Sequence, residues 1–414
     1  MRILKAFKWL YPGMWIKRWI MLVVFGIILI SMGFVMVLLE ETSQQKTLSG
    51  IIIILGILAV VTGVKRIIKS FVTILLPERE DELVDKVYQK RILERGLRFV
   101  VIGGGTGLST LLHGLKEYTS NITAIVTVAD DGGSSGKLRH DFGVLPPGDI
   151  RNCLVALADA EPLMRKLFQF RFDEGTEFKG HSFGNLFITA MSKVTGAFDT
   201  AIKESSKVLA IRGSVLPSTL EKVTLTAEHE NGSFSVGESH IPEAKSPIKK
   251  VYLTPKTSRP TNEVIDAIQK ADVVILGPGS LYTSVIPNLL IKGIYQEITR
   301  SRAMKIYICN VMTQKGETDG YKASDHLKAI INHTAPKIVD YCIVNTSKVP
   351  SNMLEKYKEK DSFPVYPDVE GIRKLRCRAV EGDLINTTDF VRHNSAKLAK
   401  VTMDLAAGAK RFKI

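Results

Sequence analysis

Residues 99–152 decide the predicted fold, and they read FVVIGGGTGLSTLLHGLKEYTSNITAIVTVADDGGSSGKLRHDFGVLPPGDIRN. An apolar run at 99–102 leads into a glycine loop at 103–107, a helical stretch follows, and a second apolar run occupies 122–128. This order predicts strand, loop, helix and strand, with both strand-end loops at one edge of a parallel sheet. Because glycines let backbone N–H groups approach a phosphate and a helix start adds positive charge, a nucleotide-binding site is the first hypothesis.

The glycine loop alone is a weak signal for nucleotide binding. Its glycines do not keep the GxGxxG spacing of a Rossmann fingerprint, since Thr110 follows Gly105 and Gly107 where a third glycine is expected. An ordinary tight turn from strand to helix remains the alternative. The second strand, however, ends in Asp130 and Asp131 and then GlyGlySerSerGly, rather than in the single acid typical of a Rossmann domain. That loop favours a site for phosphate, metal or both.

Loops rich in glycine and small hydroxyl residues recur along the chain. In open α/β sheets, ligands bind outside the carboxyl ends of the strands. Such loops in one domain therefore predict an anion-binding crevice. The loops occupy residues 103–107, 130–136 with 145–152, 276–284 and 310–319.

The fold class follows from further alternation of strand and helix patterns. Apolar runs at 272–276, 305–309 and 340–344 are separated by helical stretches, which predicts a Rossmann-like α/β fold: a mostly parallel sheet with helices on both faces. Residues 220–253 alternate with a period of two around GluAsnGlySer and predict an antiparallel hairpin beside that sheet. The four scattered cysteines fit reduced, buried thiols.

Two apolar runs near the N-terminus predict a membrane hairpin. Residues 19–39 form 21 positions without a charge, which is long enough to cross a bilayer, and residues 48–64 form 17, at the short limit. Apolar residues at helical spacing in 67–75 continue the second helix or lie at the membrane interface. Two buried helices of a soluble protein are the alternative.

Charges flanking these runs predict the orientation of the hairpin. Five Lys or Arg residues precede the first run and three follow the second, whereas the connector carries two Glu and one Lys. Positive-inside bias then predicts a cell-membrane protein with two spans, whose termini and main domain all lie in the cytoplasm. We expect a hairpin with its interfacial segment at 1–76, a charged linker helix at 77–96 that could pair with a copy of itself, and a globular domain at 97–414.

The net charge of +14 divides equally between two parts of the chain. Residues 1–76 carry +7, which the membrane flanks explain, and the rest carries +7. That remainder suits an anionic ligand. Since no basic run with interleaved aromatic residues occurs, nucleic acid is not expected as a partner.

Several polar side chains are candidates for chemistry. His181 and Asn185, in GlyHisSerPheGlyAsnLeu at 180–186, would lie one turn apart on one helix face, where Asn185 could read a base or sugar edge. The alternative is that Ser182 caps the helix and His181 only packs. Asp130, Asp131 and Asp149 could hold Mg²⁺ or act as an acid/base pair, although Asp149 also suits a helix N-cap.

Six motifs in order resemble the YvcK family, a branch of the CofD-like proteins, over about residues 98–410. They are GlyGlyGlyThrGlyLeuSer (103–109), ValAlaAspAspGlyGlySerSerGly (128–136), LeuProProGlyAspIleArgAsn (145–152), GlyHisSerPheGlyAsnLeu (180–186), LeuGlyProGlySerLeuTyrThrSer (276–284) and AsnValMetThrGln (310–314).

The resemblance implies a function as well as a Rossmann-like fold. It implies binding of UDP-sugars, notably UDP-N-acetylglucosamine, and a regulatory role that links carbon flux during gluconeogenic growth to cell-wall precursors and cell shape, with a metabolic or cell-wall enzyme as partner and a homo-oligomer as the expected state. CofD relatives transfer a phospholactyl group from a nucleotide diphosphate to a deazaflavin with Mg²⁺ and an equivalent aspartate pair. The alternative is therefore a Mg²⁺-dependent phosphoryl-linked or nucleotidyl transferase.

The resemblance also assigns residues to the site. Asp130 and Asp131 would be the carboxylates for metal or phosphate, and the catalytic residues if the protein is an enzyme. The family pattern starts near the glycine loop and is soluble, so the N-terminal residues up to about 96 depart from it. The residues expected to line the nucleotide sugar are Gly104, Gly105, Thr106, Gly107, Asp149, Asn152, His181, Asn185, Gly277, Gly279, Ser280, Leu281, Tyr282, Thr283, Tyr357 and Arg392.

Overall fold

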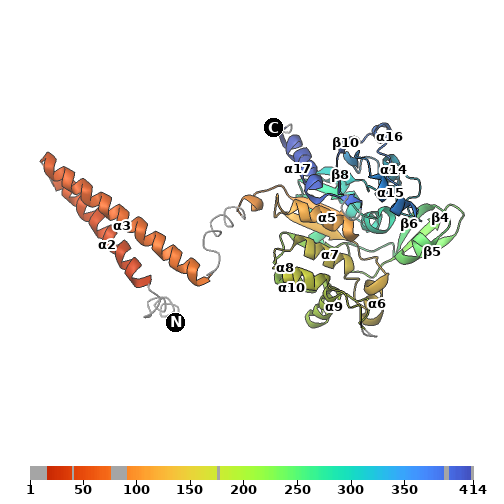
Figure 1. Cartoon of the computed structure of the whole chain (residues 1–414), viewed down its shortest axis with the longest axis horizontal. Coiled ribbons are helices and arrows are strands. Elements are labelled where there is room, and N and C mark those ends of the chain that lie inside the picture. Colours follow the sequence, from red (N-terminus) through yellow and green to blue (C-terminus); the bar gives the residue numbers. More distant parts are fainter. Residues whose placement is uncertain (1–15, 40–41, 76–90, 175–177, 387–390, 412–414) are drawn as a thin grey trace. The chain divides into compact units, whose positions relative to one another are not determined.

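The structure, a computed structural model, describes residues 16–39, 42–75, 91–174, 178–386 and 391–411. The chain divides into two units, residues 1–91 and 92–414 (Figure 1). The first unit contains the two apolar helices, and the second contains the α/β domain.

Helices α2 (Ile16–Leu39) and α3 (Ser43–Leu75) pack side by side as an antiparallel hairpin (Figure 1). The contact is made at glycines. Gly26 of α2 and Gly56 of α3 are buried although most of their apolar neighbours are exposed. A Cβ atom added to Gly56 would lie 2.8 Å from the carbonyl oxygen of Gly26, so the two backbones touch. Small residues at such positions allow close helix packing inside a membrane.

The two helices are long and apolar enough to cross a membrane over Lys17–Leu39 and Gln44–Ser70. Helix α3 runs without interruption to Leu75, so the stretch at 67–75 continues the second helix. Most of the linker helix predicted at 77–96 lies outside the described residues. Its last residues, 91–94, are helical, and the Gly96 N–H donates to the carbonyl of Leu93 (3.2 Å) where that helix ends.

We expect Gly56→Leu to loosen the hairpin, because a side chain at this position meets the backbone of α2. All three tryptophans stand at or before position 19, so tryptophan fluorescence of the full chain in detergent reports on this unit. Thermal unfolding followed this way should shift to lower temperature in Gly56→Leu. Gly50→Leu is the control, since a Cβ atom there meets nothing within 4 Å. Equal shifts in both variants would contradict the glycine contact.

The domain is built on a seven-stranded sheet in which every neighbouring pair is parallel. Five of its strands coincide with predicted apolar runs, and the two outermost strands, β3 and β10, were not predicted. The spatial order is β10 (Arg378–Gly382), β9 (Tyr341–Asn345), β8 (Met304–Ile308), β7 (Val273–Leu276), β1 (Phe99–Gly103), β2 (Ile122–Val126) and β3 (Ser214–Pro217).

The strand order reverses between β1 and β7, which are hydrogen-bonded neighbours. From β1 the chain builds outward through β2 to β3, and from β7 it builds outward in the opposite direction through β8 and β9 to β10. The loops after β1 and β7 therefore leave the sheet side by side, with a gap between the helices that follow them. This switch point is where open α/β sheets bind ligands.

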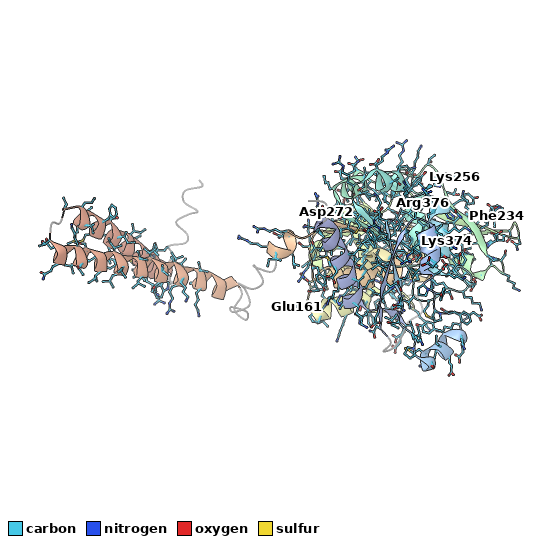
Figure 2. All side chains as sticks on the ribbon, turned by 90° about the horizontal axis from the view of Figure 1, so that it is seen from above. Glu161, Phe234, Lys256, Asp272, Lys374 and Arg376 are labelled. Carbon is cyan, nitrogen blue, oxygen red and sulfur yellow. The ribbon has the colours of Figure 1, made fainter. Side chains whose placement is uncertain are left out.

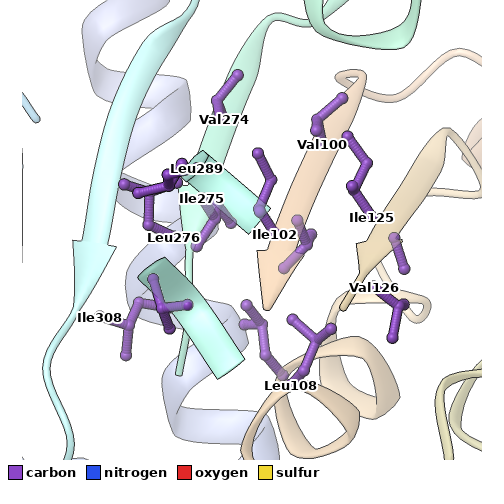
Figure 3. Packing of buried hydrophobic residues seen from close by; sticks show 14 of the residues in the cluster. Val100, Ile102, Leu108, Ile125, Val126, Val274, Ile275, Leu276, Leu289 and Ile308 are labelled. Carbon is purple, nitrogen blue, oxygen red and sulfur yellow. The ribbon is translucent and has the colours of Figure 1, made fainter. Parts of the chain in front are cut away.

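Helices cover both faces of the central strands, which explains why all five residues of β1 and all four of β7 are buried. Figure 3 shows Ile102, Ile125 and Leu276 packed among residues from neighbouring elements. The domain helices are α5 (Gly105–Leu115), α6 (Gly133–Phe142), α7 (Gly148–Leu157), α8 (Pro162–Gln169), α9 (Phe183–Thr195), α10 (Phe198–Val208), α11 (Asn262–Lys270), α12 (Ile286–Leu290), α13 (Ile294–Arg300), α14 (Ala323–His333), α15 (Ser351–Lys358), α16 (Val369–Lys374) and α17 (Ser395–Arg411).

A small antiparallel sheet stands beside the main sheet, as the alternating pattern at 220–253 predicts. Its order is β5 (Phe234–Val236), β4 (Thr224–His229) and β6 (Ile248–Thr254), and a short helix η2 (Glu238–Glu243) follows β5. Strands β11 (Ile385–Asn386) and β12 (Arg392–His393) form a further short pair. The four cysteines are unpaired and buried, as predicted.

Candidate functional site

The glycine loop connects β1 to α5 and lies against the loop that follows β7. Gly105 has φ +68°, a left-handed conformation that glycine adopts without strain. A Cβ atom on Gly107 would lie 2.8 Å from the carbonyl oxygen of Pro278 and 3.1 Å from the amide nitrogen of Gly279. The two loops therefore touch backbone to backbone, and only a glycine fits at position 107.

A cavity of about 270 Å³ opens where these loops meet, and we call it the strand-end cavity. Loops after three neighbouring strands, β1, β7 and β8, supply most of its wall, and later segments of the chain close it. Its lining residues are Gly104, Gly105, Thr106, Gly107, Thr110, Pro278, Gly279, Ser280, Asn310, Val311, Met312, Thr313, Gln314, Tyr357, Ser362, Val391, Arg392 and His393.

Side-chain amides hold the walls of this cavity in place. Asn310 donates to the carbonyl of Gly279 (2.8 Å) and accepts from the N–H of Gly279 (3.2 Å), so it clamps the loop after β7 to the loop after β8. Gln314 adds a hydrogen bond to the Ser280 hydroxyl (2.7 Å). Asn288, fully buried, donates to the carbonyls of Gly103 (3.0 Å) and Ser284 (2.7 Å) and ties the glycine loop to the helix behind it.

Tyr357 and Arg392 both reach the strand-end cavity although they are distant from the glycine loop in sequence. The Tyr357 hydroxyl accepts a hydrogen bond from the Val391 N–H (2.9 Å), which fixes the segment that carries Arg392. The structure therefore brings this pair beside Thr106 and Gly107. Their contact with a ligand stays a prediction.

Some predicted residues of the third loop lie behind the cavity wall instead of in it. Leu281, Tyr282 and Thr283 are buried in η3 (Leu281–Val285), a single π-helical turn. The Tyr282 hydroxyl bonds the Tyr321 hydroxyl (2.8 Å), and Thr283 donates to Glu317 (3.4 Å). Gly277, with φ +77°, forms the turn that leads into this segment. The structure gives these four residues a supporting position.

Asp149 contacts the glycine loop but does not line the strand-end cavity. A Cβ atom on Gly104 would overlap the Asp149 carboxylate, and that carboxylate accepts a hydrogen bond from the Gly105 N–H. Asp149 stands inside the first turn of α7, whose N-cap is Pro147, so the N-cap alternative is wrong. Burial, followed by the nearby charge of Asp130, raises the pKa of Asp149 to about 6.

The aspartate pair at the end of β2 is held by backbone amides. Asp131 accepts from the N–H groups of Glu238 (3.2 Å) and Ser239 (2.9 Å), one on each carboxylate oxygen, and Asp130 accepts from Gly132 (2.9 Å). Among the residues that the structure describes, no three His, Cys, Asp or Glu side chains are placed to hold a metal ion. Mg²⁺ is usually held by one or two carboxylates together with substrate phosphates, so magnesium at Asp130 and Asp131 stays a prediction, and we derive no step through it.

His181 and Asn185 share one partner, the hydroxyl of Ser134 in the second loop. The distances are 3.0 Å from His181 Nδ1 and 3.1 Å from Asn185 Nδ2, so the two side chains do lie on one face. Ser182 also caps α9 by accepting from the Asn185 N–H (3.2 Å). The oxygen of Asn152 accepts from Arg151 (2.6 Å). None of these residues lines the strand-end cavity.

Two further acids belong to the Asp149 side of the site, and the sequence did not single them out. Burial, followed by the charges of Asp130, Asp131 and Asp149, raises the pKa of Glu238 to about 7. Burial, followed by the charge of Glu238, raises the pKa of Glu317 to about 7, and its Oε2 atom has no hydrogen-bond partner. Carboxyl groups with such pKa values exchange protons near neutral pH.

Comparison with known proteins places this arrangement in a family. The sequence pattern of the family described as 2-phospho-L-lactate transferase CofD matches residues 99–385, well over half of the chain. This chain belongs to the CofD family. Within that family it resembles the gluconeogenesis factor of Bacillus subtilis, with 48% identity over 74% of this chain and 98% of the relative. The predicted resemblance to this branch is confirmed.

The fold of this CofD-family chain also matches a solved structure. A crystal structure of a protein from Bacillus halodurans has a TM-score of 0.72 and 49% identity, and the match covers 74% of this chain and 98% of that one. The expected Rossmann-like fold is therefore confirmed.

Relatives differ in whether they match the N-terminal quarter of the chain. A protein from Nostoc sp. is 48% identical over 100% of this chain and 95% of its own length, so the match includes both apolar helices. The expectation that the family pattern begins near the glycine loop holds for the Bacillus subtilis relative and is wrong for the Nostoc relative.

Glu317→Gln tests the buried acids through the pH dependence of stability. The pKa of Glu317 is about 7 in the folded domain against an ordinary value of 4.5, so the folded state keeps a proton that the unfolded chain releases. Stability from this group is fully present below pH 4.5 and is lost as the pH rises through 7. Glutamine stays neutral, so the variant should gain up to about 3 kcal/mol over the parent at alkaline pH.

Thermal unfolding of the full chain in detergent at about pH 5 and about pH 8 checks this expectation. The parent should lose more stability than Glu317→Gln on going to the higher pH. Glu243→Gln is the matched control, because Glu243 is exposed. An identical loss in the parent and in Glu317→Gln would contradict a protonated Glu317.

Proposed function

We propose that this CofD-family chain binds a UDP-sugar, UDP-N-acetylglucosamine, in the strand-end cavity and acts as a regulatory protein. Its role would be to link carbon metabolism during gluconeogenic growth to the supply of cell-wall precursors and to cell shape. The observation that carries the proposal is the convergence of three strand-end loops on one cavity beside the start of α5. The name of the Bacillus subtilis relative, gluconeogenesis factor, supports the metabolic part.

The cavity offers the groups that a nucleotide diphosphate needs. The N–H groups of Thr106 and Gly107 belong to the first turn of α5, where backbone donors have no partner within the helix. These donors and the helix dipole favour the diphosphate. Arg392 supplies a guanidinium at the same cavity, and Tyr357 supplies a phenol ring. Two loops and a cation would thus surround the diphosphate.

The apolar hairpin would anchor this domain at the membrane. We propose that helices α2 and α3 span the bilayer, with both termini and the CofD-like domain on the cytoplasmic side, because Lys17 and Arg18 stand at the start of the first span and Lys65, Arg66 and Lys69 lie near the end of the second. Homo-oligomers and a metabolic or cell-wall enzyme as partner are part of this proposal. Anchoring would place a nucleotide-sugar sensor beside wall synthesis.

Calorimetric titration of the full chain in detergent with UDP-N-acetylglucosamine tests the proposal. We expect a dissociation constant in the micromolar range, about −8 kcal/mol. Gly107→Ala should weaken binding at least about tenfold, because a methyl group pushes the glycine loop away from Pro278. Gly408→Ala, where a Cβ atom meets nothing within 4 Å, is the matched control and should bind like the parent.

Arg392→Ala provides a second variant in case Gly107→Ala folds poorly. Loss of one charge-assisted hydrogen bond to the diphosphate should cost about tenfold in affinity, since such bonds contribute about 1.5–3 kcal/mol. Thermal unfolding confirms that each variant is folded. The absence of heat with any UDP-sugar, in a folded parent, would end the proposal.

A transferase is the second candidate, and the buried acids favour it. Asp149, Glu238 and Glu317 have pKa values of about 6, 7 and 7, so one of them could hold or deliver a proton beside the glycine loop. The description of the matching family as a 2-phospho-L-lactate transferase supports this candidate.

Turnover discriminates between the two candidates. If the protein is a regulatory protein, no product should form from UTP with N-acetylglucosamine 1-phosphate, or from a nucleotide diphosphate donor with an acceptor. Product that Asp149→Asn abolishes, while UDP-N-acetylglucosamine still binds, would establish an enzyme instead. Phosphorus NMR of the reaction mixture measures both the donor and the product.

A further inference from the structure

A second cavity adjoins the strand-end cavity, and we call it the side groove. It measures about 530 Å³ and is lined by residues of α5, α7 and α8 and of the segment around Arg392. Thr106, Thr110 and Arg392 line both cavities, so the N-terminal turns of α5 form a shared wall. Figure 1 shows α5, α7 and α8 gathered on one part of the domain, and Figure 2 labels Glu161, the residue before α8.

The side groove is basic. Arg165 and Lys166 of α8 and Arg392 all line it, and its lining includes neither aspartate nor glutamate. Within the described part of the chain, Arg165 and Lys166 form no ion pair. The charges of Arg165 and Lys166 are therefore not balanced by an ion pair with a carboxylate of the described residues.

Nearby acids are already neutralised by another arginine. Arg212 contacts Asp159 (2.6 Å) and Glu117 (3.6 Å), and these two carboxylates stand close to the buried amine of Lys116 rather than in the groove. Because both acids pair with Arg212, they form no ion pair with Arg165 or Lys166.

His113 also lines the groove and is partly buried there. Burial, followed by the charges of Lys116 and Arg165, lowers the pKa of His113 below its ordinary value, although Glu117 and a hydrogen bond to the Ala156 backbone oppose this shift. The imidazole is then neutral at physiological pH and can donate or accept a hydrogen bond. Together with the hydroxyls of Thr106 and Thr110, it supplies neutral polar groups beside the cations.

We propose that the side groove binds a second anionic ligand, a small phosphomonoester, separate from the nucleotide sugar. A guanidinium presents a fork of donors that matches phosphate oxygens, and a lysine adds a mobile charge, so Arg165 and Lys166 can hold a dianionic phosphate. The volume of the groove falls in the range of small-molecule sites, which leaves room for a polyol or sugar attached to that phosphate. The hydroxyls of Thr106 and Thr110 and the imidazole of His113 line the groove where that polyol or sugar would lie.

The shared wall gives this site a consequence for the neighbouring cavity. A phosphomonoester that contacts Thr106, Thr110 or Arg392 would act on the residues that also line the strand-end cavity. Any change that binding at one cavity makes in affinity at the other is then the same factor in both directions. The side groove is thereby a site where a phosphorylated metabolite regulates the domain.

Binding of inorganic phosphate and of glycerol 3-phosphate to the full chain in detergent tests this site, with calorimetry at constant ionic strength as the measurement. The double variant Arg165→Gln/Lys166→Gln should weaken binding of both probes at least about tenfold, because two charged partners are lost. The charge-matched control is Lys245→Gln/Lys328→Gln, two exposed lysines that do not line the groove, and it should bind like the parent.

The competing outcomes separate this proposal from the proposed function. Probes that still bind after saturation with UDP-N-acetylglucosamine support a separate groove, whereas complete displacement would assign the phosphate to the strand-end cavity and overturn the proposal. No binding to a folded parent, or unchanged binding in a folded double variant, would also overturn it. The chain could also bind the probes through Arg165 and Lys166 and yet bind no UDP-sugar. That result would support the phosphate site in the side groove and contradict the proposed nucleotide-sugar function.

Discussion

The backbone contact between Gly107 and Pro278 is the constraint on which the rest of the site depends. It exists because β1 and β7 are neighbours in the sheet although about 170 residues separate them in sequence. Each strand ends in a loop that turns toward the other, and the missing side chain at position 107 lets the two main chains touch. Any side chain there would separate the loops and widen the gap in which a diphosphate would lie.

Amide side chains then convert that contact into a fixed wall. Asn310 forms hydrogen bonds with both the N–H and the carbonyl of Gly279, and Asn288 donates a hydrogen bond to the carbonyl of Gly103 at the end of β1. These bonds form within the protein, so the loops need no ligand to become ordered. A cavity prepared in this way loses little conformational entropy when a ligand binds.

The parallel strands and their loops could be predicted from the sequence because each is a local pattern: an apolar run followed by glycines. Strands β3 and β10 were not predicted because both are short edge strands with weaker apolar patterns. Local patterns also cannot show which way a side chain points. Tyr282 was expected in the binding site, but the π-helical turn directs its hydroxyl to Tyr321 behind the wall.

The contacts of the acidic residues could not be predicted either, because they join residues that are far apart in the sequence. Asp131 was predicted as a metal ligand from its position at a strand end, and the sequence could not show that η2, which follows β5 far along the chain, supplies amides to both of its carboxylate oxygens. Glu238 and Glu317 carry no motif of their own, and only folding brings them to Asp130 and Thr283. Tyr357 and Arg392 were assigned by family resemblance alone, since nothing in their local sequence points to the glycine loop.

The glycine loop finally has groups of opposite charge near it. Asp149 accepts the Gly105 N–H, and its neighbours include Asp130, whereas Arg392 lines the strand-end cavity together with Thr106 and Gly107. An anion beside Thr106 and Gly107 repels an ionised Asp149 through a thin wall of backbone, so anion binding and protonation of Asp149 favour each other. Because its pKa is already about 6, this carboxyl needs only a modest further increase to be largely protonated at neutral pH. The backbone geometry that allows close approach to a phosphate therefore also couples the phosphate to the protonation of Asp149.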